Sequence, residues 1–78
     1  MAENSFFKNI GKEIYIITKL ITPNTYNIIS GKYAGRDGDY ILVENAELKE
    51  IENGKEKSKQ KLGNIAVNKS VISMISFA

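Results

Sequence analysis

The stretch GKYAGRDGDYILVENAE, residues 31–47, decides the fold of this chain. It joins two segments, residues 26–36 and 40–46, whose tyrosines and branched apolar residues are typical of strands. Glycine inside a strand weakens it unless the backbone bends or bulges there. Gly31 and Gly35 therefore predict that the first of these strands is long and sharply bent.

The sequence between the two strands, GRDGDY, allows three interpretations. As a hairpin turn, it needs Gly38 with a positive φ and an Asp37 side chain that bonds to nearby backbone. As a metal or acid–base pair, its two carboxylates are too few, because a divalent cation needs more oxygen ligands. In the third interpretation, which is compatible with the turn, polar side chains cluster at one rim, where arginine and tyrosine stack on a base and aspartate accepts hydrogen bonds from its edge. The residues expected at this rim are Arg36, Asp37, Asp39 and Tyr40.

The three glycines of this stretch do not form a phosphate-binding loop. A Walker loop requires Lys-Ser or Lys-Thr at a fixed place after the glycines, and neither dipeptide follows here. The spacing of a dinucleotide-binding loop is also absent.

The other segments predict a mainly all-β fold. Residues 5–11 are expected to form a short helix, which Ser5 caps and Gly11 ends. Further strands are expected over residues 13–20, 62–67 and 71–77, the last two separated by Asn68, Lys69 and Ser70. Residues 1–78 thus predict a single domain, a short N-terminal helix followed by a strongly bent five-stranded antiparallel small barrel.

Residues 48–61 are polar and strongly charged, with Asn53-Gly54 near the middle. Asn-Gly is a strong hairpin signal, so the stretch predicts a charged hairpin tip or loop. Alternating lysines in it would lie on one face of an extended arm and suit contacts with phosphates. The alternative is a solvated loop that keeps the chain soluble. The lysines of this basic loop are Lys55, Lys57, Lys59 and Lys61.

The composition argues against catalysis. The chain has no cysteine and no histidine, which excludes disulfides, thiolate metal sites, the usual general base and the usual nucleophilic triads. We therefore expect a protein that is not an enzyme and needs no cofactor or metal. The net charge is only +2, and no apolar run approaches the length of a membrane span. The first residues do not resemble a secretory signal, so we expect a cytoplasmic protein with no membrane partner.

Taken together, these features resemble the Sm and Sm-like family. Gly31, Asp37 and YILVENAE look like its first motif, and KLGNIAVNKSVISMIS, with Gly63, looks like its second. Residues 48–61 fall where the family has a variable loop. The family usually has an asparagine where this chain has Asp39 or Tyr40, and arginine-glycine where it has Asn68-Lys69. The turn between the strands expected at residues 26–36 and 40–46 also looks about one residue shorter than in the family.

The resemblance implies an RNA pocket built from two loops. An unstacked base would lie between a tyrosine and a lysine or arginine, and a ring of subunits would repeat the pocket around a pore. Carried over by position, the pocket residues are Asp37, Asp39 and Tyr40 from one loop and Asn68, Lys69 and Ser70 from the other.

The C-terminal strands predict self-association. AVNKSVISMISFA carries one charge, Lys69, and its two short strands would be aggregation-prone if both were free edges. Pairing the fourth strand of one copy with the fifth of the next would cover both edges head to tail, and this predicts a closed homo-oligomeric ring of about five to seven copies.

The leading functional hypothesis is therefore a non-catalytic, ring-forming protein that binds single-stranded RNA, or DNA, in RNA processing or regulation. The main alternative is an SH3-like interaction or scaffold module without a nucleic-acid role. A DNA-binding barrel that uses the lysine arm and a purely structural oligomer are further alternatives.

Overall fold

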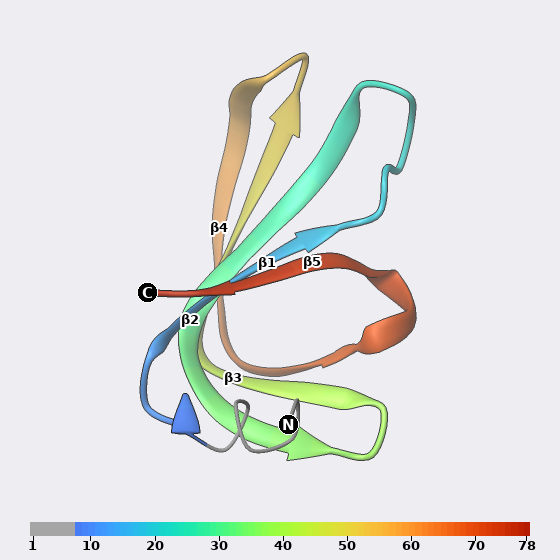
Figure 1. The fold of residues 1–78 in the computed structure, drawn as a ribbon. Helices are drawn as coiled ribbons and strands as arrows, with labels where there is room; N and C mark the ends of the chain where they lie inside the picture. Colours follow the sequence, from blue (N-terminus) through green and yellow to red (C-terminus); the bar gives the residue numbers. More distant parts are fainter. Residues whose placement is uncertain (1–7) are drawn as a thin grey trace.

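Five antiparallel strands make up most of residues 8–78, the part of the chain that the computed structural model describes (Figure 1). The strands form one strongly bent sheet in the order β4-β3-β2-β1-β5, so β4 and β5 are its two edges. This confirms the predicted five-stranded antiparallel architecture and the two strands expected at the edges. The elements are β1 (Glu13–Thr18), β2 (Thr25–Asp37), β3 (Tyr40–Glu52), β4 (Lys55–Asn68), a 3-10 turn η1 (Lys69–Val71) and β5 (Ile72–Phe77).

The charged stretch 48–61 is the tip of a hairpin, as its Asn53-Gly54 pair predicted, and not an irregular loop. Both of its halves are strand, and only Asn53 and Gly54 lie outside the β3–β4 ladder. Their φ angles, 52° and 77°, are both left-handed, as a two-residue turn of the Asn-Gly kind requires. The polar residues form strands because cross-strand pairing satisfies their backbone groups, which the polar composition did not reveal.

Most of the helix expected over residues 5–11 lies outside the described residues. Within residues 8–78 only Lys8 is α-helical, and residues 9–11 form a turn that leads into β1. This turn is tied to β2, because the Gly11 N–H donates to the Tyr33 carbonyl (2.8 Å) and the Tyr33 N–H donates to the Lys12 carbonyl (2.9 Å).

The bend of β2 is centred on Gly31. A Cβ at this position would lie 2.6 Å from Val43 Cγ1 and 2.7 Å from the Glu44 carbonyl oxygen, closer than a real Cβ approaches another heavy atom. The pairing of β2 with β3 shifts between Ser30 and Lys32, which straddle this glycine. Gly31 therefore lacks a side chain because the backbone of β3 occupies the space that it would need.

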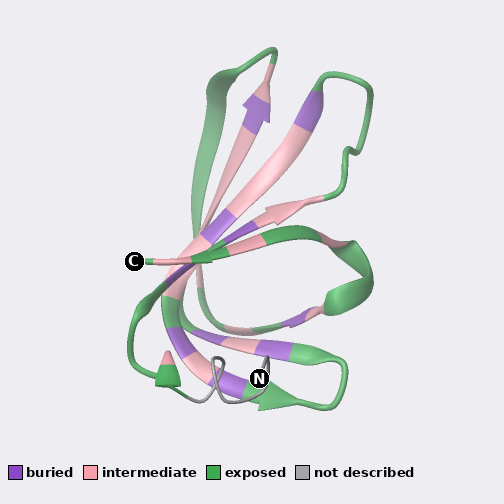
Figure 2. Ribbon diagram, in the orientation of Figure 1, coloured by how far each residue is buried: buried purple, intermediate pink, exposed green. Residues whose placement is uncertain are grey.

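Most of the buried residues lie on the three central strands, β1, β2 and β3 (Figure 2). Tyr33, just beyond the bend, is 1% exposed and packs edge-on against Phe77 of β5, with ring centroids 5.2 Å apart. This contact joins the middle of the sheet to an edge strand and thus folds the sheet toward a barrel. The buried core cluster comprises Ile14, Ile16, Ile29, Tyr33, Ile41, Val43, Ala46 and Val67.

Replacement of Gly31 by alanine should destabilise the fold by about 1–3 kcal/mol, because the added methyl group overlaps the backbone of β3. Chemical denaturation monitored by circular dichroism measures this loss. Gly54→Asn is the control, because position 54 has open space around it and asparagine tolerates its left-handed φ. Equal stabilities of the two variants would contradict the close approach at Gly31.

The burial of Tyr33 predicts a loss of stability in alkali. Burial raises the pKa of its phenol, and the nearby Arg36 opposes this rise. The folded state therefore favours the neutral phenol, so this stabilisation is complete below the ordinary tyrosine pKa of about 10 and is lost as the pH rises above it. Between about pH 8 and about pH 11, the free energy of unfolding should fall more for the native protein than for Tyr33→Phe, which keeps the ring but cannot ionise. Equal falls would show that the phenol does not contribute.

Candidate nucleic-acid interface

The turn between β2 and β3 lies against the connection between β4 and β5. Tyr40 and Asn68 are paired residues at the adjoining ends of β3 and β4. Just beyond this pair, the Lys69 N–H donates to the Asp39 carbonyl over 2.8 Å, and Lys69 Nζ lies 3.2 Å from Asp39 Oδ1. The structure thus brings together the two loops that the sequence predicted as parts of one site.

Local sequence explains the shape of each loop. Gly38 has a φ of 59°, which lets the β2–β3 turn close with only Gly38 and Asp39 between the strands. In the other loop, Asn68 caps the 3-10 turn, because its Oδ1 accepts a hydrogen bond from the Ser70 N–H over 2.9 Å. This cap holds Lys69 at the first position of the turn, beside Asp39.

A pocket of about 150 Å³ lies where the two loops meet. Its polar groups are Arg36, Asp39 and Lys69, whereas isoleucines from β3 and β5 supply apolar surface. The side chains of Asp39 and Lys69 are 67% and 65% exposed, so both remain accessible to a ligand. The pocket is lined by Arg36, Gly38, Asp39, Ile41, Lys69, Ile72 and Ile75.

Tyr40 does not line this pocket, which corrects the expected arrangement. Arg36 is paired with Ile41, whereas Asp37 is paired with Tyr40, one position further along each strand. Because successive side chains of a strand point to opposite faces of the sheet, Asp37 and Tyr40 lie on the face opposite Ile41. Asn68, the partner of Tyr40 on β4, lies on that same face. The predicted single rim is therefore divided between two faces of the sheet.

The face opposite the pocket still offers an aromatic surface. Tyr40 is 46% exposed, beside Asn68 on the neighbouring strand. The Asn68 side-chain oxygen already accepts one hydrogen bond, from the Ser70 N–H. A base that stacks on Tyr40 would therefore lie on the other side of the sheet from Lys69, not between the two side chains as the sequence suggested.

The four lysines of the charged arm do not share one face. The β3–β4 pairing shifts between Glu50 and Ile51, opposite Lys57. As a result, Lys55 pairs with Glu52 on one face, whereas Lys59 and Lys61 lie on the other. The lysines were predicted to lie on one face because they alternate in sequence, and this prediction fails because the bulge adds one residue to β4.

Glutamates on the arm also neutralise several of its lysines. Lys57 Nζ lies 3.5 Å from Glu52 Oε2, and Lys59 Nζ lies 3.6 Å from Glu47 Oε1. A third pair joins Lys49 of β3 to Glu56 of β4 over 3.8 Å. All three pairs are substantially exposed and contribute little to stability, but they leave the arm without a continuous basic face.

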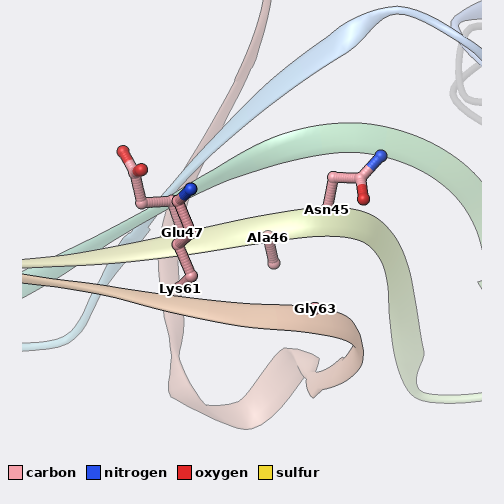
Figure 3. A pocket seen from close by; sticks show the side chains of 5 residues that line it. All are labelled: Asn45, Ala46, Glu47, Lys61 and Gly63. Atoms are coloured by element: carbon pink, nitrogen blue, oxygen red, sulfur yellow. The ribbon is translucent and has the colours of Figure 1, made fainter.

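A second pocket, of about 240 Å³, was not expected from the sequence (Figure 3). It lies between β3 and β4, where the pairing shifts on both sides of Ala46. Asn45 has a left-handed φ of 51°, and its N–H donates to the side chain of Asn64 instead of to the partner backbone. Figure 3 shows the short Ala46 side chain pointing from β3 toward β4. Gly63, with a φ of 74°, was the only sequence signal for this irregularity.

Metal and membrane sites are also absent from the described region. Within residues 8–78, no group of three or more acidic side chains is placed to hold a metal ion. No helix in the same range is long and apolar enough to cross a bilayer.

Comparisons with known proteins find a likeness among solved structures. No family model matches the sequence, and no curated protein matches it. Among solved structures, the chain is similar to a heptameric archaeal Sm protein, with a TM-score of 0.65 and 26% identity over 96% of this chain and 97% of that chain. The likeness extends over nearly the whole length of both proteins. The chain therefore has the fold of an Sm protein, as the resemblance of its sequence predicted.

Proposed function

We propose that this chain is a non-catalytic protein that forms a homo-oligomeric ring and binds single-stranded RNA where the β2–β3 and β4–β5 loops meet. The observation that carries the proposal is the pocket between these loops, in which Arg36, Asp39 and Lys69 surround an apolar surface. Similarity to a heptameric Sm protein supports both parts of the proposal.

The charge on the two edge strands supports a ring. β5 carries no charged residue, and neither does β4 from Leu62 to Asn68. The other half of β4, residues 55–61, carries four lysines and a glutamate, which discourage strand pairing. Only the uncharged half of β4 is thus suited to pair with β5 of another copy. Because the two edges are different surfaces, the contact is head to tail, and it closes into a ring of about five to seven copies.

The pocket supports RNA binding by its mixture of surfaces. Unpaired bases bind proteins by stacking and by hydrogen bonds along their edges. The isoleucines offer apolar contact, Arg36 offers a planar cation, and Asp39 and Lys69 offer an acceptor and a donor. Each pocket is small and exposed, so its affinity is low by itself. A ring multiplies the affinity, because one strand then contacts several pockets at once.

An SH3-like protein-interaction module is the second candidate function. Leu20 and Ile21, in the connection between β1 and β2, are 63% and 60% exposed and offer an apolar contact. A partner protein bound there would not depend on Arg36 or Lys69. The experiments below distinguish these two functions.

The ring is tested by a proline at Ile75. The Ala78 N–H donates to the Glu13 carbonyl, and hydrogen-bonded pairs alternate along an antiparallel ladder. With Ile75 paired to Ile16, the Ile75 N–H should therefore point to the free edge. Ile75→Pro removes this donor but spares the hydrogen bonds to β1, so it should convert the ring to folded monomers. Native mass spectrometry measures the assembly, and circular dichroism measures the fold.

The matched control for this experiment is Ile75→Val. It also shortens the side chain but keeps the N–H, so its ring should survive. A native protein that is monomeric at micromolar concentration would contradict the ring. A proline variant that assembles normally would contradict β5 as the contact.

RNA binding is tested with a fluorescent single strand of mixed sequence and a DNA duplex. Lys69→Ala and Arg36→Ala should each weaken binding of the single strand, because each removes a hydrogen-bond donor from the pocket. Arg36→Ala should also reduce the salt dependence of binding, because it removes a cation that can contact a phosphate. Lys49→Ala is the control, since it also removes a lysine in an exposed ion pair, but on the β3–β4 arm.

The titrations have clear contrary outcomes. Binding that is insensitive to salt, or equally weakened by all three variants, would contradict the pocket as the RNA site. Preference for the duplex would favour a DNA-binding protein. No binding of either nucleic acid would favour the protein-interaction function.

A further inference from the structure

We propose that the pocket between the two loops selects guanine, and that Asp39 is the residue that determines this specificity. The inference rests on the proposed function, since it names the base that the same RNA site prefers. Its basis is the ion pair between Asp39 and Lys69 on the rim of the pocket.

The ion pair makes Lys69 a poor phosphate ligand. Its ammonium lies 3.2 Å from the Asp39 carboxylate, which cancels most of its charge and repels a nearby phosphate. A pocket built for the RNA backbone would not place a carboxylate beside its lysine. Arg36 is the one cation lining the pocket for which the described residues show no ion pair. The pair of Asp39 and Lys69 is therefore better suited to the edge of a base.

The pair retains hydrogen-bonding capacity for such an edge. An ammonium has three donors and a carboxylate has about four acceptor sites. The contact between Lys69 Nζ and Asp39 Oδ1 uses one of each, and both side chains are about two-thirds exposed. What remains is a donor next to an acceptor that can receive two N–H groups.

Guanine matches this pattern along its Watson–Crick edge. Its O6 accepts a hydrogen bond, and the adjacent N1–H and 2-amino group donate two. O6 can therefore receive a hydrogen bond from Lys69 while N1–H and the amino group donate in parallel to the Asp39 carboxylate. Parallel hydrogen bonds to an ionised group are stronger and more directional than bonds between neutral groups.

The other three bases match less well. Uracil has its single N–H between two carbonyls, so one carbonyl would face the carboxylate. Cytosine and adenine each place a ring nitrogen lone pair next to their amino group, and this lone pair would also face the carboxylate. Each mismatch replaces a hydrogen bond by a repulsion between two acceptors.

The remaining surfaces of the pocket accommodate a purine. Ile41, Ile72 and Ile75 provide apolar contact for a ring face. The Arg36 guanidinium, on the same rim, is planar and can stack on a base. These contacts are tolerant of sequence, which leaves the choice between bases to the ion pair of Asp39 and Lys69.

The test compares short uridine strands in which one central position is guanosine, adenosine, cytidine or uridine. Competition against a fluorescent strand, followed by anisotropy with the native oligomer, should show that guanosine binds about 5- to 10-fold more tightly than the others. This range is the low end for a two-bond base contact, as expected for an exposed carboxylate.

Modified purines identify the edge that is read. Inosine, which lacks the 2-amino group, should lose most of the preference. 7-Deazaguanosine, which keeps the Watson–Crick edge and alters the opposite one, should bind like guanosine. If inosine bound like guanosine and 7-deazaguanosine lost the preference, the assignment to the Watson–Crick edge would be overturned. This comparison needs no variant protein.

Asp39→Asn tests the residue itself. The amide can no longer accept two N–H groups as a charged acceptor, and it offers a donor to a uracil carbonyl. The guanosine preference should fall to about twofold or less. The control is Glu52→Gln, which makes the same change of charge and disrupts another exposed ion pair, with Lys57 on the arm. It should keep the full preference.

Each outcome supports or contradicts a defined statement. RNA binding without a guanosine preference, or a preference that survives Asp39→Asn, would overturn the inference and leave the proposed function intact. Failure of every strand to bind would overturn both.

Discussion

The close approach of β2 and β3 at Gly31 is the constraint on which the rest of this structure depends. A Cβ there would overlap both Val43 and the Glu44 carbonyl, so only a glycine lets the two backbones come together. This close approach bends the 13-residue strand β2, so that its two parts can belong to the two halves of the curved sheet. It also carries Tyr33 into the core, where the ring meets Phe77 of the far edge strand. Without the bend, the sheet would remain open and flat, and these two residues would not meet.

The curvature also determines how the sheet ends. β4 and β5 are consecutive in sequence and joined by one short turn, yet they lie at opposite edges of the sheet. Each edge leaves backbone groups without a strand partner in a single copy. The lysines discourage pairing along half of β4, and the uncharged half is left for another strand. Pairing of β4 with another chain is thereby limited to its uncharged half. This limit favours a defined assembly over disordered association.

The ion pair between the two loops at one end of the sheet illustrates that such a pair can contribute to ligand recognition while contributing little to stability. An exposed pair such as Asp39 and Lys69 contributes little to folding. The pair places a hydrogen-bond donor beside an acceptor on the rim of an apolar pocket. A backbone hydrogen bond between the same two residues holds both side chains there. Of the three longer ion pairs of the charged arm, one also reaches a pocket, because Glu47, the partner of Lys59, lines the pocket between β3 and β4. The surroundings of a pair, more than its distance, decide what it can recognise.

The sequence by itself determined the local features. Isoleucine and tyrosine density, with glycines and an Asn-Gly turn, predicted the five strands and the bent second strand. The likeness to Sm proteins was predicted by the resemblance of two motifs to those of that family. The glycines were informative because five of the six have a positive φ, which other residues rarely adopt, and the sixth, Gly31, lies where there is no room for a side chain. The two loops of the site were also correctly predicted to meet, although only through the family resemblance.

Only the tertiary structure decided which side chains share a face. A bulge adds a single residue to a strand and reverses the facing of every residue beyond it. One such bulge separates Lys55 from Lys59 and Lys61, and strand pairing puts Tyr40 on the face opposite the pocket. The strands of the charged arm likewise depend on cross-strand bonds, which composition does not encode. These features follow from pairing between segments distant in sequence, and a local pattern cannot specify the register of that pairing.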